Sequence, residues 1–128
     1  MIGGKVLDAG AIAAACAGHI GVTAWFAVAA RVGIVLYLPG PALVEVATLR
    51  PHAGPRLARL LDHPQVVRGD ANGTTTTEAD QLMTAAGVWD ATAAIVVRVA
   101  RHRGWPVLAA DPGRLHRIDP ALDVEPVT

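Results

Sequence analysis

The sequence predicts an α/β fold, a three-layer sandwich in which helices flank a central, mainly parallel sheet of four to five strands. Short runs that are apolar throughout, such as IVLYLP at residues 34–39, alternate with longer helix-forming stretches. A strand that is buried on both faces of a parallel sheet has this continuous apolar pattern. The chain has 128 residues, which suits one domain and leaves little room for two. We therefore expect a single domain over residues 1–128.

Glycine and proline divide the first half of the chain into elements. Gly18 and Gly21 interrupt the first helix-forming stretch, Gly33 closes the next, and prolines bound two further helices. The predicted elements are a strand in residues 5–10 that ends at Asp8, a helix-forming stretch after it, a helix at 22–33, a strand at 34–39, and helices within 40–51 and 54–64.

The second half of the chain repeats the alternation of strands and helices. Residues 65–70 are a strand candidate, and residues 71–87 predict a loop that leads into a helix. Residues 90–104 are apolar on nearly every helical face until the last turn, which predicts a helix buried between layers. Residues 105–111 predict a buried strand, and DPG at residues 111–113 predicts a turn. The region near Val124 predicts a short edge strand.

Composition narrows the classes of protein to consider. Net charge is zero, with 11 basic and 11 acidic residues, so charge neither predicts nor excludes a nucleic-acid partner. The lone Cys16 excludes an intramolecular disulfide framework and fits a reducing cytoplasm. Residues 9–30 carry no formal charge, but Asp8, His19 and several glycines make a poor signal peptide or spanning helix. We expect a cytoplasmic protein without a membrane role.

Carboxylates stand where the predicted elements begin or end. Asp8 and Asp111 end predicted strands, so both are expected at the carboxyl edge of the sheet, where α/β proteins place functional groups. Asp90 opens a helix, and Glu45 lies inside one. Each acid also has an ordinary interpretation, because Asp8 and Asp90 suit helix caps, Asp111 suits a turn, and Glu45 suits a solvent-facing position.

Together the four acids predict a metal centre. Several carboxylates in one cleft repel each other and resist ionisation, and a divalent cation removes that penalty. Mg²⁺ and Mn²⁺ prefer oxygen ligands and keep several waters, so a few carboxylates suffice. Such a centre can activate water and stabilise the charge that builds on a phosphate during phosphodiester cleavage.

The order of these segments resembles the PIN-domain ribonucleases, especially the VapC-type toxins of bacterial toxin–antitoxin pairs. The segments are VLDAG, ALVEVATL, WDATAAIVVRVARHRG and WPVLAADPGRLHRI, and the most specific part is residues 90–117. The resemblance covers nearly the whole chain. It implies a PIN-like sheet, an acidic pocket for Mg²⁺ or Mn²⁺, single-strand-specific endoribonuclease activity, a homodimer, and inhibition by an antitoxin.

The resemblance also implies a role for each acid. Asp8 and Asp90 match the firmest metal ligands, and Glu45 matches a residue that binds metal or orients the attacking water. Asp111 matches a residue that supports a ligand through water or binds a second ion. The expected catalytic and metal-binding residues are therefore Asp8, Glu45, Asp90 and Asp111.

The chain departs from the family pattern at two positions beside these acids. Gly10 and Ala109 stand where the family often has Ser or Thr, and lost support of this kind weakens metal affinity by about 10–100-fold. Thr48 and Thr92 are candidates to compensate. A weak or inactive nuclease, which binds RNA or an antitoxin without cleavage, therefore stays open as the alternative.

Two further hypotheses concern residues outside the acids. Arg114 and Arg117 follow the last acid and suit contacts with RNA phosphates, although surface charge in a terminal loop explains them equally well. A receiver-like signalling domain ranks last among the functions, because the chain lacks a pair of acids after its first strand.

Overall fold

A computed structural model describes residues 3–70 and 73–127, with only the backbone described for residues 73 and 74. The strands are β1 (Gly4–Leu7), β2 (Val35–Pro39), β3 (Val66–Gly69), β4 (Val107–Ala109) and β5 (Val124–Pro126). The helices are α1 (Ala9–Cys16), α2 (Ile20–Val32), α3 (Gly40–Leu49), the 3₁₀ turn η1 (Pro51–Ala53), α4 (Gly54–Leu61), α5 (Gly73–Ala86), α6 (Ala91–Arg103) and α7 (Pro112–His116).

The five strands form one parallel sheet in the order β3-β2-β1-β4-β5. This confirms the predicted α/β class, the strand count and the short edge strand near Val124. Because β1 lies between β2 and β4, the first strand of the chain is at the centre of the sheet. The residues that follow β1 and β4 are therefore neighbours at its carboxyl edge.

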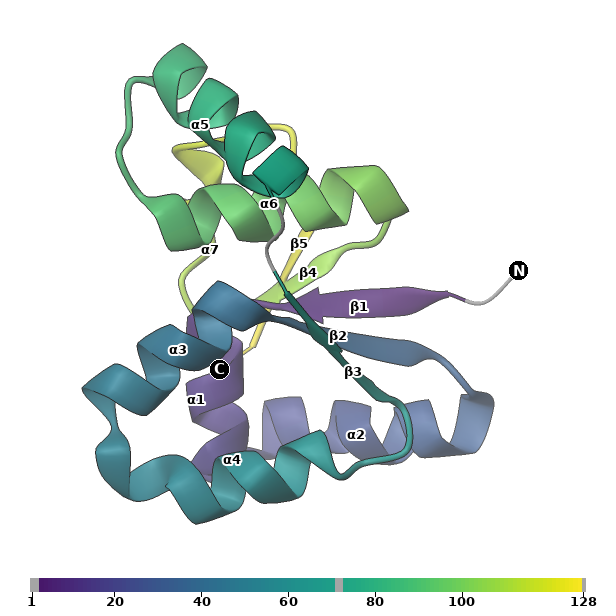
Figure 1. The fold of residues 1–128 in the computed structure, drawn as a ribbon. Helices are drawn as coiled ribbons and strands as arrows, with labels where there is room; N and C mark the ends of the chain where they lie inside the picture. The colour runs from purple at the N-terminus through teal and green to yellow at the C-terminus, as the bar shows by residue number, and fades with distance from the viewer. Residues whose placement is uncertain (1–2, 71–72, 128) are drawn as a thin grey trace.

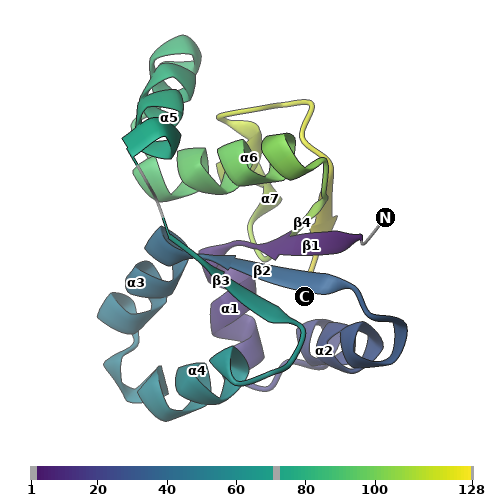
Figure 2. The same cartoon turned by 45° about the vertical axis from the view of Figure 1, so that its right-hand side comes forward.

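Helices cover both faces of the sheet, which makes the three layers that the sequence predicts. Figures 1 and 2 show α1, α2 and α4 on one side and α5 with α6 on the other. Helix α3 begins directly after β2 and contacts both α1 and α6. It therefore joins the two helical layers at the carboxyl edge.

The core is built from the central strands and from small helical side chains. Val6, Leu36 and Leu108 of the three central strands are fully buried. Helix α6 buries five consecutive residues, Ala93–Val97, as expected for a helix that is apolar on nearly every face. Alanines of α1 pack against the same core, so the helices lie close to the sheet.

Most element ends follow the chemistry that predicted them. Gly33 and Gly104 have positive φ values of 79° and 68° and end α2 and α6 in the left-handed conformation that favours glycine. Two predictions were wrong in detail. Helix α2 begins at Ile20 and continues through Gly21, and DPG does not form an isolated turn but starts α7, with Asp111 as its N-cap and Pro112 at its first position.

In residues 3–70 and 73–127, no single helix combines the length and the apolar composition needed to cross a membrane, and two sharply bent helix pairs meet that requirement only jointly.

Candidate functional site

Asp8 and Asp111 lie side by side at the carboxyl edge of the sheet, as predicted from the strand ends. The backbone N–H of Asp8 donates to the Leu108 carbonyl at 3.1 Å, which ties the end of β1 to β4. Asp8 Oδ1 accepts from the Ala11 N–H at 2.7 Å and so caps α1. Asp111 Oδ1 accepts from the Arg114 N–H at 3.3 Å and caps α7. The cap interpretation thus holds for both acids.

Glu45 and Asp90 approach this edge from two different helices. Glu45 lies midway along α3, and its side chain is 24% exposed. Asp90 caps α6 by accepting from the Ala93 N–H at 3.2 Å, and its side chain is 25% exposed. Both carboxylates are thus partly shielded from water, which strengthens their interaction with any cation between them.

That cation is the guanidinium of Arg114, which donates hydrogen bonds to both carboxylates. Nη1 and Nη2 donate to the two oxygens of Glu45, each at 2.7 Å. Nε donates to Asp90 Oδ2 at 2.7 Å, and Nη2 also donates to Asp90 Oδ1 at 3.0 Å. Four charge-assisted bonds of this geometry are among the strongest polar contacts in proteins. Arg114 thereby fixes α3, α6 and α7 relative to one another.

Arg114 favours the ionised form of both Glu45 and Asp90. Its hydrogen bonds hold the pKa of Glu45 and of Asp90 below their ordinary values, against a smaller opposing effect of burial. A hydrogen bond from the Thr92 side chain also lowers the pKa of Glu45. In turn, the two carboxylates raise the pKa of Arg114 above its already high value. All three groups are therefore charged across the physiological range.

Asp8 behaves in the opposite way. It is only 5% exposed, and burial raises its pKa from 3.8 to about 6. The backbone N–H groups of Ala11 and Ala110 and the charge of Arg114 lower that pKa, while the charge of Asp111 raises it. Asp8 lies near the arginine but makes no hydrogen bond to it, so the guanidinium offsets its charge less than it offsets the charges of Glu45 and Asp90.

Of the four predicted acids, Glu45 and Asp90 thus bind the guanidinium of Arg114, whereas Asp111 accepts from its backbone N–H and Asp8 lies near its charge. The four acids do not converge on one metal position. Among the described residues, no group of three or more His, Cys, Asp or Glu side chains is placed to hold a metal ion. The donors suit a hard divalent cation by their chemistry. With the guanidinium of Arg114 between Glu45 and Asp90, however, the arrangement fits an arginine side chain and leaves no position for a metal ion between these two carboxylates.

The two departures from the family pattern have a structural context. An added Cβ at Gly10 would lie 2.8 Å from the Ala110 Cβ and 3.5 Å from Asp8 Oδ1, so the loop after β4 leaves no room for a side chain there. Ala109 is fully buried at the end of β4. Of the two candidate hydroxyls, Thr92 interacts with Glu45, whereas Thr48 lines a neighbouring cavity.

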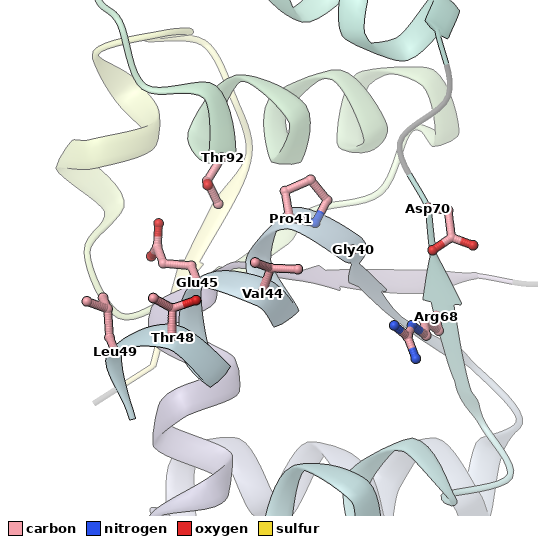
Figure 3. Close-up of a pocket in the computed structure, with 9 residues that line it drawn as sticks. All are labelled: Gly40, Pro41, Val44, Glu45, Thr48, Leu49, Arg68, Asp70 and Thr92. Atoms are coloured by element: carbon pink, nitrogen blue, oxygen red, sulfur yellow. The ribbon is translucent and has the colours of Figure 1, made fainter. Parts of the chain in front are cut away.

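A cavity of about 690 Å³ opens beside Glu45. Its wall includes Pro41, Val44 and Leu49 as well as Thr48 and Thr92. Figure 3 shows Thr92 and Glu45 directed toward each other at one end, with Arg68 and Asp70 at the other. Of the four predicted acids, Glu45 lines the cavity, whereas Asp8, Asp90 and Asp111 do not.

The two arginines that were predicted to contact RNA differ in their surroundings. Arg114 is engaged by Glu45 and Asp90, whereas Arg117 is exposed and near enough to Asp90 to lower its pKa. An RNA contact by either residue stays a prediction. The pairing of Arg114 with the acids was not predicted, and its one signal in the sequence is an arginine three residues after Asp111.

Comparisons with known proteins identify the fold through solved structures. No protein-family model matches the sequence, and no curated protein matches it. Solved structures do match, at low sequence identity. VapBC2 from Rickettsia felis, bound to a DNA fragment from their promoter, has a TM-score of 0.78 and 11% identity and covers 98% of this chain and 99% of its own.

Two further structures give the same result. VapC20 from Mycobacterium tuberculosis, a toxin that cleaves the sarcin-ricin loop, has a TM-score of 0.65 and 18% identity, with 83% of this chain and 87% of that chain covered. PAE2754 from Pyrobaculum aerophilum has a TM-score of 0.65 and 19% identity, with 96% and 92% covered. The chain therefore has the PIN-domain fold of VapC-type toxins.

Proposed function

We propose that this protein is a metal-dependent endoribonuclease that cleaves single-stranded RNA as the toxin of a toxin–antitoxin pair. The observation that carries the proposal is the gathering of Glu45, Asp90 and Asp111 around Arg114, with Asp8 next to them. The guanidinium of Arg114 binds Glu45 and Asp90, its backbone N–H donates to Asp111, and its charge acts on Asp8, all at the carboxyl edge of a VapC-like sheet. Such an edge is where α/β folds place their chemistry.

In this proposal the ion is Mg²⁺ or Mn²⁺, and Asp8, Glu45, Asp90 and Asp111 hold it. When bound, the ion supplies an activated water and stabilises charge on the phosphate. Arg114 must first release Glu45 and Asp90, because its guanidinium lies between them. Once released, Arg114 is free to pair with an RNA phosphate, a group that its planar fork suits.

An RNA-cleavage assay tests the proposal. Purified protein is incubated with total RNA in Mn²⁺, in Mg²⁺ and in EDTA. We expect cleavage with a divalent ion, none in EDTA, and a loss of at least about 100-fold in Asp8→Asn and Asp90→Asn. Asp80→Asn is the matched control, since Asp80 is exposed on α5. Cleavage that is absent under every condition, or equal in all variants, contradicts the proposal.

A second candidate function is a PIN-like module that binds RNA or an antitoxin without cleavage. The observations that favour it are the occupied position of Arg114 and the missing hydroxyls at Gly10 and Ala109. The two candidates separate in one experiment. A non-cleaving module retains RNA or antitoxin binding in Mn²⁺ while the RNA stays intact.

The proposed partners follow from the same likeness. The similarity to VapBC2 supports an antitoxin partner, and the RNA substrate with the single Cys16 supports a cytoplasmic location. We also propose a homodimer, because Val44 and Leu49 are 63% and 73% exposed beside the cavity on α3. Light scattering during gel filtration should give the mass of two chains, and Leu49→Glu should give the mass of one.

A further inference from the structure

Four exposed basic side chains gather where α1, α3 and α4 meet. These residues, which we call the basic surface, are Arg50, His52, Arg56 and Arg59. Arg50, His52 and Arg56 line a cavity of about 270 Å³, and Arg56 and Arg59 line an adjoining one of about 360 Å³. No carboxylate of residues 3–70 and 73–127 lines either cavity, so the charged side chains that line them are all basic.

The arginines of this surface lack a carboxylate partner among the described residues, whereas four of the other eight Lys and Arg side chains have one. Lys5, Arg98, Arg101 and Arg114 each form an ion pair. Within the described residues no ion pair joins Arg50, Arg56 or Arg59 to an acid. Because unpaired guanidinium groups keep their full attraction for an anion, the charges of this surface are available to a ligand.

One of these side chains is held in place. Arg56 Nη1 donates to the Cys16 carbonyl at 2.8 Å, at the end of α1. This contact uses one of the five N–H donors of a guanidinium. A fixed arginine loses less conformational entropy when it binds, which favours affinity.

Charge is also segregated along the chain. Residues 9–61 contain four arginines, at positions 31, 50, 56 and 59, and a single acid, Glu45. The zero net charge of the whole chain therefore conceals a basic region. The acids lie mostly in the other part of the molecule, which includes three of the four predicted site residues.

Helices α1 and α3 connect the predicted acids to the basic surface. Asp8 caps the start of α1, which ends at Cys16 beside Arg56, and Glu45 lies on α3, which ends next to Arg50. Figure 1 shows α1 and α3 leading from the sheet edge toward α4, and the two helices contact each other. Five residues of helix separate Glu45 from Arg50, which is about 7.5 Å along the axis. A strand of a few nucleotides spans such a separation.

We propose that the basic surface binds the phosphate backbone of the single-stranded RNA whose scissile bond lies at the acids, an inference that rests on the nuclease function proposed above. Arginine is the residue best suited to phosphate by geometry and charge, and basic grooves that follow the backbone are how proteins hold single strands without reading sequence. The surface directs the strand along α3, away from the cleavage position.

RNA binding in the absence of metal tests this inference. A short fluorescein-labelled single-stranded RNA is titrated with the protein in EDTA at several KCl concentrations, and anisotropy gives the affinity at each. The variant Arg50→Gln/Arg59→Gln removes two charges that make no described contact within the protein. Arg31→Gln/Arg101→Gln is the control for the same change in net charge at exposed positions of other helices, although Arg101, unlike Arg50 and Arg59, lies 4.0 Å from Asp119 in an ion pair.

The expected result is quantitative. Each lost phosphate contact reduces the slope of log K against log salt concentration by about 0.7 for a single strand. The double variant should therefore show a slope smaller by about 1.4 and an affinity roughly tenfold weaker near physiological salt. Adding Arg56→Gln should reduce the slope further, while the control variant keeps the wild-type slope.

Three results would overturn the inference. The first is the absence of RNA binding by the wild type, and the second is an equal slope in the test and control variants. The third is a double variant that binds RNA as the wild type does but has lost affinity for polyglutamate, an acidic polymer measured in the same way. The last result would assign the surface to an acidic protein partner. Failure of the nuclease function is distinguishable, because it shows in the cleavage assay with Mn²⁺ and leaves RNA binding in EDTA intact.

Discussion

Arg114 holds the carboxylate of Glu45 with two parallel hydrogen bonds of 2.7 Å, across a separation of 69 residues in the chain. The same guanidinium binds Asp90. One internal cation thus bonds to two carboxylates that approach from different helices, and it offsets one of their two negative charges. The divalent ion of the proposed nuclease would have to compete with this arginine for the same oxygens.

The first prediction concerns this competition. Arg114→Met removes the guanidinium and leaves Glu45 and Asp90 without a counter-ion, so Mn²⁺ should bind at least about tenfold more tightly, or about 1.4 kcal/mol. The concentration of free Mn²⁺ in electron paramagnetic resonance titrations measures this without reference to activity. Arg117→Met is the control, because Arg117 is also near Asp90 but does not bridge the pair. An unchanged or weaker affinity in Arg114→Met would contradict direct competition.

The second prediction concerns stability at low pH. Arg114 lowers the pKa of Glu45 and Asp90 in the folded state, so their contribution to stability is present above the unfolded values of 4.5 and 3.8 and is lost as pH falls through the lower folded values. We expect this contribution to be about 1–3 kcal/mol. Urea unfolding at a series of pH values measures it, and Arg114→Met should lack it. Parallel pH profiles for the two proteins would contradict the prediction.

The third prediction concerns Asp8 and has the opposite sign. Because its folded pKa is about 6 and its ordinary value 3.8, the folded state holds a proton more tightly than the unfolded state. Asp8 therefore destabilises the fold increasingly as pH rises from about 4 to 6, and by a constant amount above that range. Asp8→Asn keeps a good N-cap residue and should stabilise the protein by about 1–3 kcal/mol at pH 7.

Below about pH 4 most of the gain from Asp8→Asn should be lost, because the unfolded state, with its value of 3.8, then also becomes protonated at this position. Urea unfolding at pH 7.5 and at pH 3.5 separates the two cases. Asp80→Asn, at an exposed position on α5, should change stability little at either pH. A stabilisation by Asp8→Asn that is independent of pH would show that burial of the charge is not its cause.

The sequence predicted the fold better than the site, for physical reasons. The strands around Val6, Leu36 and Leu108 are buried on both faces, and continuous burial leaves an unambiguous apolar pattern in the sequence. Gly33 and Gly104 end helices in a left-handed conformation that other residues adopt rarely, so they marked the helix ends. Helix α7 was missed because Asp-Pro-Gly suits a β-turn and a helix start equally well.

The site depends on contacts that a linear pattern does not contain. Asp8 and Asp111 were placed correctly because β1 and β4 are parallel neighbours, and strand ends meet at one edge. The bridge of Arg114 to Glu45 requires α3 and α7 to meet, and nothing in either segment encodes that meeting. The net charge of the sequence is limited in the same way. Its value of zero does not show that Arg50 and Arg59 lie apart from the acids.

The last prediction concerns the close contact between Gly10 and the loop after β4. An added Cβ at position 10 would lie 2.8 Å from the Ala110 Cβ, a separation that requires the loop to shift. Gly10→Ser would supply the hydroxyl that the resemblance leads one to expect, but we expect it to destabilise the protein by about 1–3 kcal/mol through overpacking. Ala110→Gly removes the opposing methyl group, so the double variant Gly10→Ser/Ala110→Gly should regain most of that loss relative to Ala110→Gly alone.

A double-mutant cycle of urea unfolding measures the coupling between the two positions. Gly54→Ser serves as the control for the change of residue type, because an added Cβ at Gly54 meets no atom within 4 Å. If Gly10→Ser were as stable as the wild type, or Ala110→Gly failed to relieve its loss, the steric explanation for glycine at position 10 would be wrong. If the double variant also binds Mn²⁺ more tightly than Ala110→Gly, the missing hydroxyl accounts for part of the low metal affinity expected of this site.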